Sequence, residues 1–156
     1  MPHVEHKRDN FTVSTDKARL QLDMIHEFLT NAYWSKHIPM KIVRKAVKHS
    51  LCFGVYDGER QIGFARVISD YATFAYLADV FILDLYRGKG LSKWLIECVM
   101  AHPDLQELRT FILFTRDAHG LYRRYGFETI TIPERVMAIH DANIYLKYAE
   151  EQSPSP

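Results

Sequence analysis

The sequence predicts an α+β domain built around an antiparallel sheet. Three strand-like runs follow one another at residues 51–56, 62–68 and 73–83. Asp57-Gly58-Glu59-Arg60 separates the first two runs, as a hairpin turn would. The third run is long, apolar and aromatic, which is typical of a central strand covered on both faces. These runs predict an antiparallel meander at the centre of the fold.

Helical spacing of apolar residues predicts two helices before this meander and two after it. The expected helices cover residues 14–31, 39–48, 91–101 and 118–125. Side-chain oxygens at residues 14–16 could cap the first helix, and Pro39 suits the first turn of the second. Further strands are predicted at residues 11–14, 109–115, 127–132 and 136–146.

The composition predicts one soluble globular domain. A chain of 156 residues with 47% hydrophobic and 25% charged residues is large enough to bury a single core. We expect a flexible N-terminus over residues 1–10, a domain over residues 11–148 and a disordered tail over residues 149–156. The polar start and the lack of a long uninterrupted apolar run predict a cytoplasmic protein that does not bind membranes.

Charge and cysteine spacing exclude other classes. Twenty Lys and Arg residues against 19 Asp and Glu give a net charge of +1, which disfavours a nucleic-acid-binding domain. The arginines that such a domain would use are Arg116, Arg123 and Arg124. Cys52 and Cys98 lie in apolar runs without metal-ligand spacing, so we expect buried thiols and no metal site.

The most informative segment is Arg87-Gly88-Lys89-Gly90, which joins a predicted strand to a predicted helix. Glycines let the backbone approach a bulky anion, and the first N–H groups of the helix point at that anion. Arg87 and Lys89 add positive charge. The segment could instead be a structural turn, and it matches neither the P-loop nor the dinucleotide fingerprint.

A second segment, Asp117 to Phe127, predicts a short helix that carries Tyr122 and ends at Gly126. Together the two segments resemble the GNAT superfamily of N-acetyltransferases. The sequence Arg87-Gly88-Lys89-Gly90-Leu91-Ser92 is similar to the pyrophosphate loop of that family. The later family segment is matched at Ala118, Leu121, Tyr122, Gly126 and Phe127. The resemblance covers residues 11–148.

This resemblance implies a mixed, mostly antiparallel sheet of six or seven strands with about four helices. The strands at 73–83 and 109–115 would splay apart to admit the pantetheine arm of acetyl-CoA. That arm would pair with the backbone of Phe81, Ile82 and Leu83. The pyrophosphate would lie on the amides of Arg87, Gly88, Lys89, Gly90, Leu91 and Ser92. Thr115 stands where many members have an asparagine that contacts the pantetheine.

The implied reaction is direct transfer of the acetyl group to an amine, with Tyr122 as the general acid. The amine must lose a proton before it attacks, and the tetrahedral intermediate needs an oxyanion donor. A backbone N–H near Phe81 is the candidate donor, and Asp79 is the candidate base. Water could replace Asp79, which would then only bind a cationic acceptor, while His119 and Glu97 are poorer candidates.

Tyr33, Trp34 and Tyr76 complete the predicted site. Tyr33 and Trp34 lie in the loop that would cover the acceptor, although the loop could equally be an anchor on the sheet. With Asp79 they suit a primary amine on an apolar or aromatic body. The expected partner is a small-molecule or protein amine, with a homodimer as an open option. The alternative is a non-catalytic acyl-CoA-binding or interaction module. The presence of Tyr122 favours an enzyme over this alternative.

Overall fold

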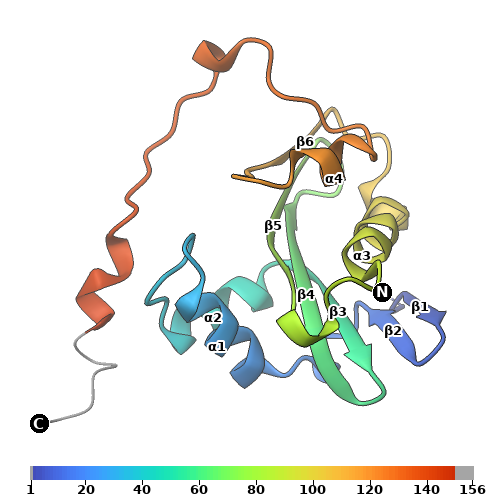
Figure 1. Cartoon of the computed structure of the whole chain (residues 1–156). Helices are drawn as coiled ribbons and strands as arrows, with labels where there is room; N and C mark the ends of the chain where they lie inside the picture. Colours follow the sequence, from blue (N-terminus) through green and yellow to red (C-terminus); the bar gives the residue numbers. More distant parts are fainter. Residues whose placement is uncertain (1, 150–156) are drawn as a thin grey trace, which may run out of the picture.

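Six strands form one sheet in the order β1-β2-β3-β4-β5-β6 (Figure 1). The computed structural model describes residues 2–149. All neighbouring strands are antiparallel except β5 and β6, which are parallel. The strands are β1 (Glu5–Arg8), β2 (Phe11–Ser14), β3 (Leu51–Asp57), β4 (Arg60–Ser69), β5 (Phe74–Ile82) and β6 (Thr110–Leu113). The mixed, mostly antiparallel α+β sheet that the sequence predicted is confirmed.

Four α-helices and five 3-10 turns complete the described chain. The α-helices are α1 (Leu22–Asn31), α2 (Met40–Lys48), α3 (Leu91–Met100) and α4 (His119–Arg123). The 3-10 turns are η1 (Lys17–Arg19), η2 (Asp84–Tyr86), η3 (Pro103–Leu105), η4 (Pro133–Arg135) and η5 (Ile144–Tyr148). Within residues 2–149, every helix is too short or too polar to cross a bilayer.

Alternating side chains divide the core between the two faces of the sheet. In β3, Phe53 and Val55 join a cluster with α3, while Cys52 joins a cluster with α1 and α2. Successive side chains of a strand point to opposite faces, so each face receives its own helices. The helices therefore cover both faces of the central strands (Figure 1).

The predicted meander is present as β3, β4 and β5. Asp57 pairs with Arg60 across the hairpin, and Gly58 has a φ of 59° that few other residues adopt. The first predicted helix, in contrast, begins later than expected. The Asp16 carboxylate accepts a hydrogen bond from Ala18 N–H at 2.9 Å and caps only η1, so α1 begins separately at Leu22.

The N-terminus is not flexible throughout, as residues 1–10 were expected to be. Residues Glu5–Arg8 form β1, which pairs with all four residues of β2. The Arg8 guanidinium lies over the Trp94 ring, 5.0 Å from its centre. Pairing with β2 and this cation-π contact order a segment whose own composition is polar.

The two closing strands predicted at residues 127–132 and 136–146 do not form, and this prediction was wrong. That part of the chain contains η4 and η5, and residues 128–143 arch away from the sheet (Figure 1). Pro133 interrupts the segment, and η5 lies on the far side of the arch, where Lys41 Nζ is 4.9 Å from the centre of the Tyr148 ring. A high strand propensity does not by itself provide a neighbouring strand with which this segment could pair. The predicted tail lies outside the described residues, except for Ala149.

Buried thiols and phenols predict loss of stability at alkaline pH. Burial raises the pKa of Cys52 from 9.0 to about 11 and that of Tyr56 from 10.0 to about 12. The folded state retains these protons at a pH where the unfolded chain releases them. The contribution of these groups to the free energy of unfolding is therefore complete below pH 9 and is lost as the pH rises through 12. We expect the free energy of unfolding to fall by about 3 kcal/mol for each such group over that range.

Urea unfolding followed by tryptophan fluorescence at a series of pH values measures this loss. Burial also raises the pKa of Cys98 to about 11, so Cys52→Val should remove only part of the decline that begins near pH 9, and Cys52→Val with Cys98→Val should leave only the part above pH 10. An unfolding free energy that stays constant from pH 8 to pH 11 would contradict the prediction.

Candidate active site

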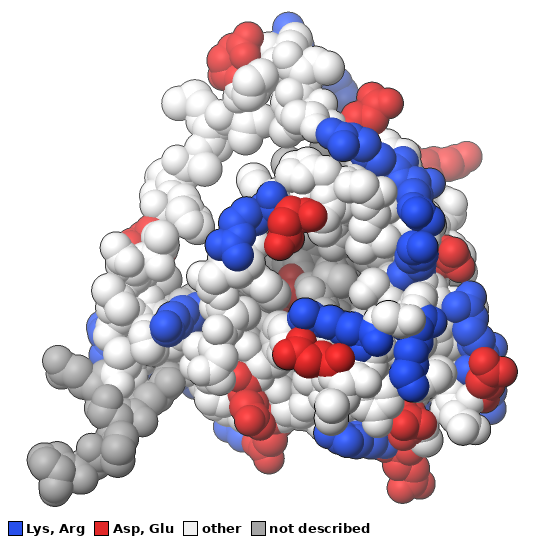
Figure 2. Space-filling view, viewed as in Figure 1, with Lys and Arg blue, Asp and Glu red and all other residues white. Residues whose placement is uncertain are grey.

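The sheet opens between β5 and β6. The two strands pair only from Phe74 and Thr110 to Leu77 and Leu113, whereas β5 continues to Ile82. A cleft of about 890 Å³ lies at this opening and is lined by α1, β4, β5, α4 and the loops beside them. Figure 2 shows the hollow, with basic side chains on both of its rims. The splayed parallel strands that the resemblance implied are therefore present.

A bulge in β5 occurs at the mouth of the opening. Phe64 pairs with Phe81, and Arg66 pairs with Ala78. Asp79 and Val80 on β5 therefore together oppose the single β4 residue that lies between Phe64 and Arg66. Asp79 has a φ of 55°, in the left-handed region that non-glycine residues rarely adopt. Bulges and such backbone strain are common beside functional sites.

The bulge determines which backbone N–H groups face the opening. Leu83 N–H donates to the Ile62 carbonyl at 2.8 Å, so it points towards β4. Because N–H directions alternate along a strand, the Phe81 N–H also points towards β4, and those of Val80 and Ile82 point towards the opening. Val80 is therefore a better oxyanion candidate than Phe81.

Asp79 holds two side chains in the cleft beside the bulge. Its Oδ1 accepts a hydrogen bond from Trp34 Nε1 at 2.9 Å, and its Oδ2 accepts one from Arg66 Nε at 2.8 Å. The Arg66 and Asp79 side chains are only 16% and 11% exposed. Arg66 Nη1 also donates to Ser50 Oγ at 3.2 Å. Both oxygens of the predicted base therefore already accept hydrogen bonds, and one of them faces a buried cation.

The three predicted acceptor residues lie in the same cleft. Tyr33 and Trp34 meet edge to face with ring centres 5.2 Å apart, and Tyr76 meets Phe114 in the same way at 5.5 Å. The Arg116 guanidinium lies over the Tyr33 ring, 3.9 Å from its centre. These contacts give this part of the cleft an aromatic lining, and the cleft also contains the carboxylates of Asp79 and Asp117.

Tyr122 lies in the same cleft, on α4. Its side chain is buried and its ring meets that of Phe127 edge to face at 6.0 Å. Burial raises the pKa of Tyr122 from 10.0 to about 12. Within residues 2–149 its hydroxyl makes no hydrogen bond, which leaves it available to a bound molecule.

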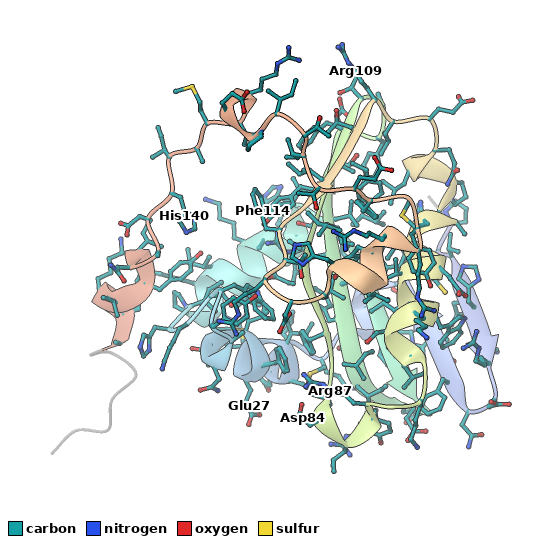
Figure 3. The ribbon with its side chains drawn as sticks, turned by 45° about the horizontal axis from the view of Figure 1, so that its top comes forward. Glu27, Asp84, Arg87, Arg109, Phe114 and His140 are labelled. Atoms are coloured by element: carbon teal, nitrogen blue, oxygen red, sulfur yellow. The ribbon has the colours of Figure 1, made fainter. Side chains whose placement is uncertain are left out.

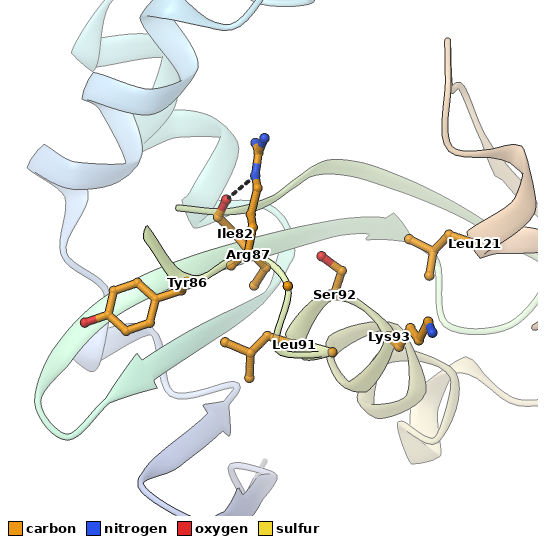
Figure 4. Close-up of a pocket in the computed structure, with 9 residues that line it drawn as sticks. Ile82, Tyr86, Arg87, Leu91, Ser92, Lys93 and Leu121 are labelled. Carbon is orange, nitrogen blue, oxygen red and sulfur yellow. Dashed lines mark hydrogen bonds between the residues drawn. The ribbon is translucent and has the colours of Figure 1, made fainter. Parts of the chain in front are cut away.

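The predicted anion loop forms a second hollow of about 440 Å³ (Figure 4). Gly88 and Gly90 have φ values of 82° and 76°, and a Cβ atom at either would meet nothing within 4 Å. Gly90 caps α3 without a side-chain hydrogen bond, so the first N–H groups of this ten-residue helix are open to an anion. Ser92 lines both hollows and connects the loop to the cleft.

Arg87 has local partners in this structure, although its side chain is 61% exposed. Its Nε donates to the Ile82 carbonyl at 3.3 Å (Figure 4), and its Nη1 lies 3.1 Å from Asp84 Oδ1. The predicted pantetheine contact Thr115 also has a local partner, because its Oγ1 accepts a hydrogen bond from Ala118 N–H at 3.0 Å. Thr115 thereby helps the chain to enter α4, while still lining the cleft.

Sequence reasoning missed several residues that line the cleft. Among them are Phe28, Arg66, Phe114, Arg116, Asp117 and Tyr145. A lone arginine in the apolar run at 62–68 was a signal for Arg66, since a charge in a buried strand needs a partner. No comparable signal existed for Tyr145, which comes from the C-terminal segment. Within residues 2–149 no three His, Cys, Asp or Glu side chains form a metal-binding group.

The split sheet, the glycine loop at the start of α3 and the cleft between them define a class of acyl-transferring α+β proteins. Residues 48–129 match the family model described as the acetyltransferase (GNAT) domain. The chain belongs to the GNAT family and is an acetyltransferase.

Three relatives illustrate this membership. A Gibberella zeae protein named as an acetyltransferase is 31% identical over 136 residues, covering 74% of this chain and 77% of its own. A Xanthomonas campestris structure, named as a GNAT-family acetyltransferase, is 53% identical with a TM-score of 0.85, covering 86% of this chain and 96% of its own. A GNAT structure from Elizabethkingia anophelis with acetyl-CoA bound is 15% identical with a TM-score of 0.60, covering 78% of each chain, and shows the shared fold.

Proposed function

We propose that this protein transfers the acetyl group of acetyl-CoA directly to a primary amine carried on an apolar or aromatic body. The observation that carries the proposal is a pair of adjoining hollows that share four lining residues, Ile82, Arg87, Ser92 and Leu121. One hollow contains the glycine loop, and the other contains Tyr122 and Asp79 with its aromatic neighbours. Family membership supports acetyl-CoA as the donor, and the cleft lining supports the acceptor class.

In this proposal the coenzyme binds from the loop towards the bulge. The pyrophosphate accepts hydrogen bonds from the first N–H groups of α3, and Lys89 and Arg87 neutralise its charge. An anion at this position draws the Arg87 guanidinium away from Ile82. The Ile82 carbonyl and N–H can then pair with the pantetheine amides as a further strand would.

The acetyl group then lies at the bulge, beyond the last paired residues of β5 and β6. The Val80 N–H donates to the carbonyl oxygen as negative charge develops there. On the opposite wall the Tyr122 hydroxyl donates to the sulfur as the carbon–sulfur bond breaks. A free thiol has a pKa of about 8.5, below that of Tyr122, so the hydroxyl acts mainly through a hydrogen bond that strengthens as thiolate charge develops.

We assign Asp79 to binding the ammonium form of the acceptor and to holding Trp34, rather than to removing the proton. Each of its oxygens already accepts one hydrogen bond, and Arg66 offsets its charge. The acceptor proton then leaves to water in the open cleft. The aromatic rings of Tyr33 and Tyr76 contact the body of the amine.

Asp79→Asn tests this assignment through the pH dependence of the reaction. Asparagine keeps one acceptor oxygen but turns an amide N–H₂ towards either Trp34 or Arg66, so we expect KM for the amine to rise about 10-fold or more at pH 7. If Asp79 only binds the cation, kcat should recover above the pKa of the amine, where the acceptor is already neutral. A kcat that stays about 10²-fold low or more at every pH would show that Asp79 is the base.

Two controls accompany this variant. Calorimetry should give an unchanged affinity for CoA, because Asp79 lines the larger hollow and not the one formed by the glycine loop. Thermal unfolding shows how much stability is lost when the buried Arg66 loses its carboxylate partner. Trp34→Phe keeps a ring but removes the N–H donor. It should raise KM for the amine and leave the Arg66 guanidinium paired with Asp79.

The acceptor class is tested by measuring thiol release from acetyl-CoA with a panel of amines. We expect kcat/KM to be highest for primary amines on aromatic or apolar bodies and low for amines that carry carboxylate or phosphate groups. A preference for an anionic amine would overturn the proposed pocket, while absence of turnover with every amine would overturn the proposed reaction.

A further inference from the structure

We propose that a contact between Arg116 and Tyr33 restricts the acceptor to small-molecule amines and excludes the amines of polypeptides. This inference rests on the proposed function, because it concerns the acceptor in the same cleft. Both side chains line the cleft, and the Arg116 guanidinium lies over the Tyr33 ring, 3.9 Å from its centre. Tyr33 is 55% exposed and Arg116 is also exposed. The contact, here called the cross-cleft contact, therefore lies at the mouth of the cleft.

The cross-cleft contact joins the two walls of the opening between β5 and β6. Tyr33 lies in the loop between α1 and α2, which belongs to the wall with Asp79, because Trp34 Nε1 donates to Asp79 Oδ1 at 2.9 Å. Arg116 lies in the loop between β6 and α4. That loop begins at Phe114, beyond the end of β6 (Figure 3), and leads into the helix that carries the proposed acid. The contact therefore spans the cleft from one wall to the other.

Both ends of the cross-cleft contact lie on anchored loops. Ser35 is buried, and its hydroxyl donates to the Leu29 carbonyl at 2.6 Å, which fixes the loop that carries Tyr33. In the other loop Thr115 Oγ1 accepts a hydrogen bond from Ala118 N–H at 3.0 Å. The backbone on each side is thus held in place, and the arginine side chain is the part that has to move when the contact opens.

The ring of Tyr33 is the partner that accounts for the position of the Arg116 guanidinium. Within residues 2–149 this guanidinium forms no ion pair, although Asp117 is its neighbour in the chain. A cation over an aromatic face is attracted by the electrons of the ring, and the attraction is weaker at an exposed site than at a buried one. The contact can therefore open, but an acceptor that keeps it open loses binding free energy.

Tyr145 encloses the same space from a third side. It lies on η5, lines the cleft and packs against the cluster beneath α1 and α2. Burial, and then the carboxylate of Asp79, raises the pKa of Tyr145 above its ordinary value, as expected for groups that share one pocket. With the sheet as its floor, the space beside Asp79 is bounded by two loops and by η5.

The volume of the cleft also favours a small acceptor. It is about 890 Å³, within the usual range for small-molecule sites, and in the proposed function the same cleft holds the acetyl end of the coenzyme. Each further residue of an extended polypeptide adds about 3.5 Å to its length. A peptide therefore has to leave the cleft past the cross-cleft contact or past Tyr145, whereas a small amine can fit inside both.

The acceptor preference of Arg116→Ala tests this inference. The two probes are phenethylamine and the peptide amide Phe-Ala-Ala-Ala-NH₂, whose first residue presents the same aromatic group at the same spacing from its amine. We expect the wild-type kcat/KM, measured by thiol release from acetyl-CoA, to be lower for the peptide by about 10-fold or more. Arg116→Ala should reduce that difference by about fivefold or more, because it removes the side chain that the peptide must displace.

Two variants serve as controls. Arg116→Lys keeps a cation that can lie over the Tyr33 ring, so its discrimination should stay within about twofold of the wild type. Arg124→Ala removes the same charge from an exposed arginine that does not line the cleft, and it should leave kcat/KM for both probes unchanged. Since Arg116 is exposed, circular dichroism of its variants should match the wild type.

Calorimetry with the CoA-bound protein repeats the comparison without the reaction. We expect the wild type to bind phenethylamine more tightly than the peptide and Arg116→Ala to narrow this difference. Equal binding and acetylation of both probes by the wild type, or unchanged discrimination in Arg116→Ala, would overturn the inference and leave the proposed function intact. A wild type that binds phenethylamine selectively but transfers acetyl to neither probe would contradict the proposed function and support the selectivity of the pocket.

Discussion

Tyr122→Phe is expected to lower kcat by about 10²- to 10⁴-fold. The substitution removes the buried hydroxyl and keeps the ring, so the edge-to-face contact with Phe127 survives. The affinity for CoA should stay within about threefold, since the hydroxyl interacts with the sulfur mainly as thiolate charge develops in the transition state. Single-turnover measurements of acetyl transfer separate this loss from any change in product release.

Tyr125→Phe is the matched control for this loss. Tyr125 lies two residues after the end of α4, but its hydroxyl donates to the Lys93 carbonyl and to Glu97, and its side chain does not line the cleft. Its removal should leave kcat within about twofold of the wild type. If Tyr122→Phe also stays within about threefold while chemistry limits the rate, water or another group assists the leaving thiolate.

The pH profile provides a second test of Tyr122. With its pKa raised to about 12, the hydroxyl keeps its proton throughout the range in which amine acceptors are titrated. We therefore expect kcat of the wild type to rise with pH and to reach a plateau, with no decline at any pH below 10. A descending limb near neutral pH would identify a different acid.

The parts of the fold that the sequence predicted correctly depend on local patterns. The β3–β4 hairpin follows from a four-residue turn between two strand-like runs, and α3 follows from apolar spacing after two glycines. β1 was missed because its residues are polar and it is ordered by pairing with β2 and by the Arg8 contact with Trp94. The closing strands were predicted from propensity alone, which cannot show whether a partner strand lies within reach.

The candidate site also divides into residues that local motifs predict and contacts that depend on pairing between distant segments. Tyr122 and the glycine loop lie in contiguous motifs, so the family resemblance predicted them directly as site residues. The pairing of Asp79 with Arg66 and Trp34 depends on the bulge in β5 and on the register with β4, neither of which is encoded in the spacing of those three residues. For that reason the sequence offered Asp79 as a base, whereas its contacts support a role in binding the acceptor.

Gly90→Glu is expected to reduce the affinity for CoA by at least 100-fold, because it acts on the backbone and on the charge of the anion site together. Gly90 adopts a φ of 76° at the start of α3, which disfavours any side chain. The added carboxylate would lie where the pyrophosphate is proposed to bind, and it would also satisfy helix N–H groups that the phosphate oxygens need.

Isothermal titration calorimetry with CoA measures this effect, and Gly58→Glu is its matched control. Gly58 has a φ of 59° and, like Gly90, has no atom within 4 Å of an added Cβ, but it lies in the β3–β4 hairpin. The two variants therefore carry the same backbone strain and the same added charge at different places. Equal and small losses of CoA affinity in both would show that the coenzyme does not use the loop. A large loss confined to Gly90→Glu, with both proteins unfolding at similar temperatures, would place the pyrophosphate at the start of α3.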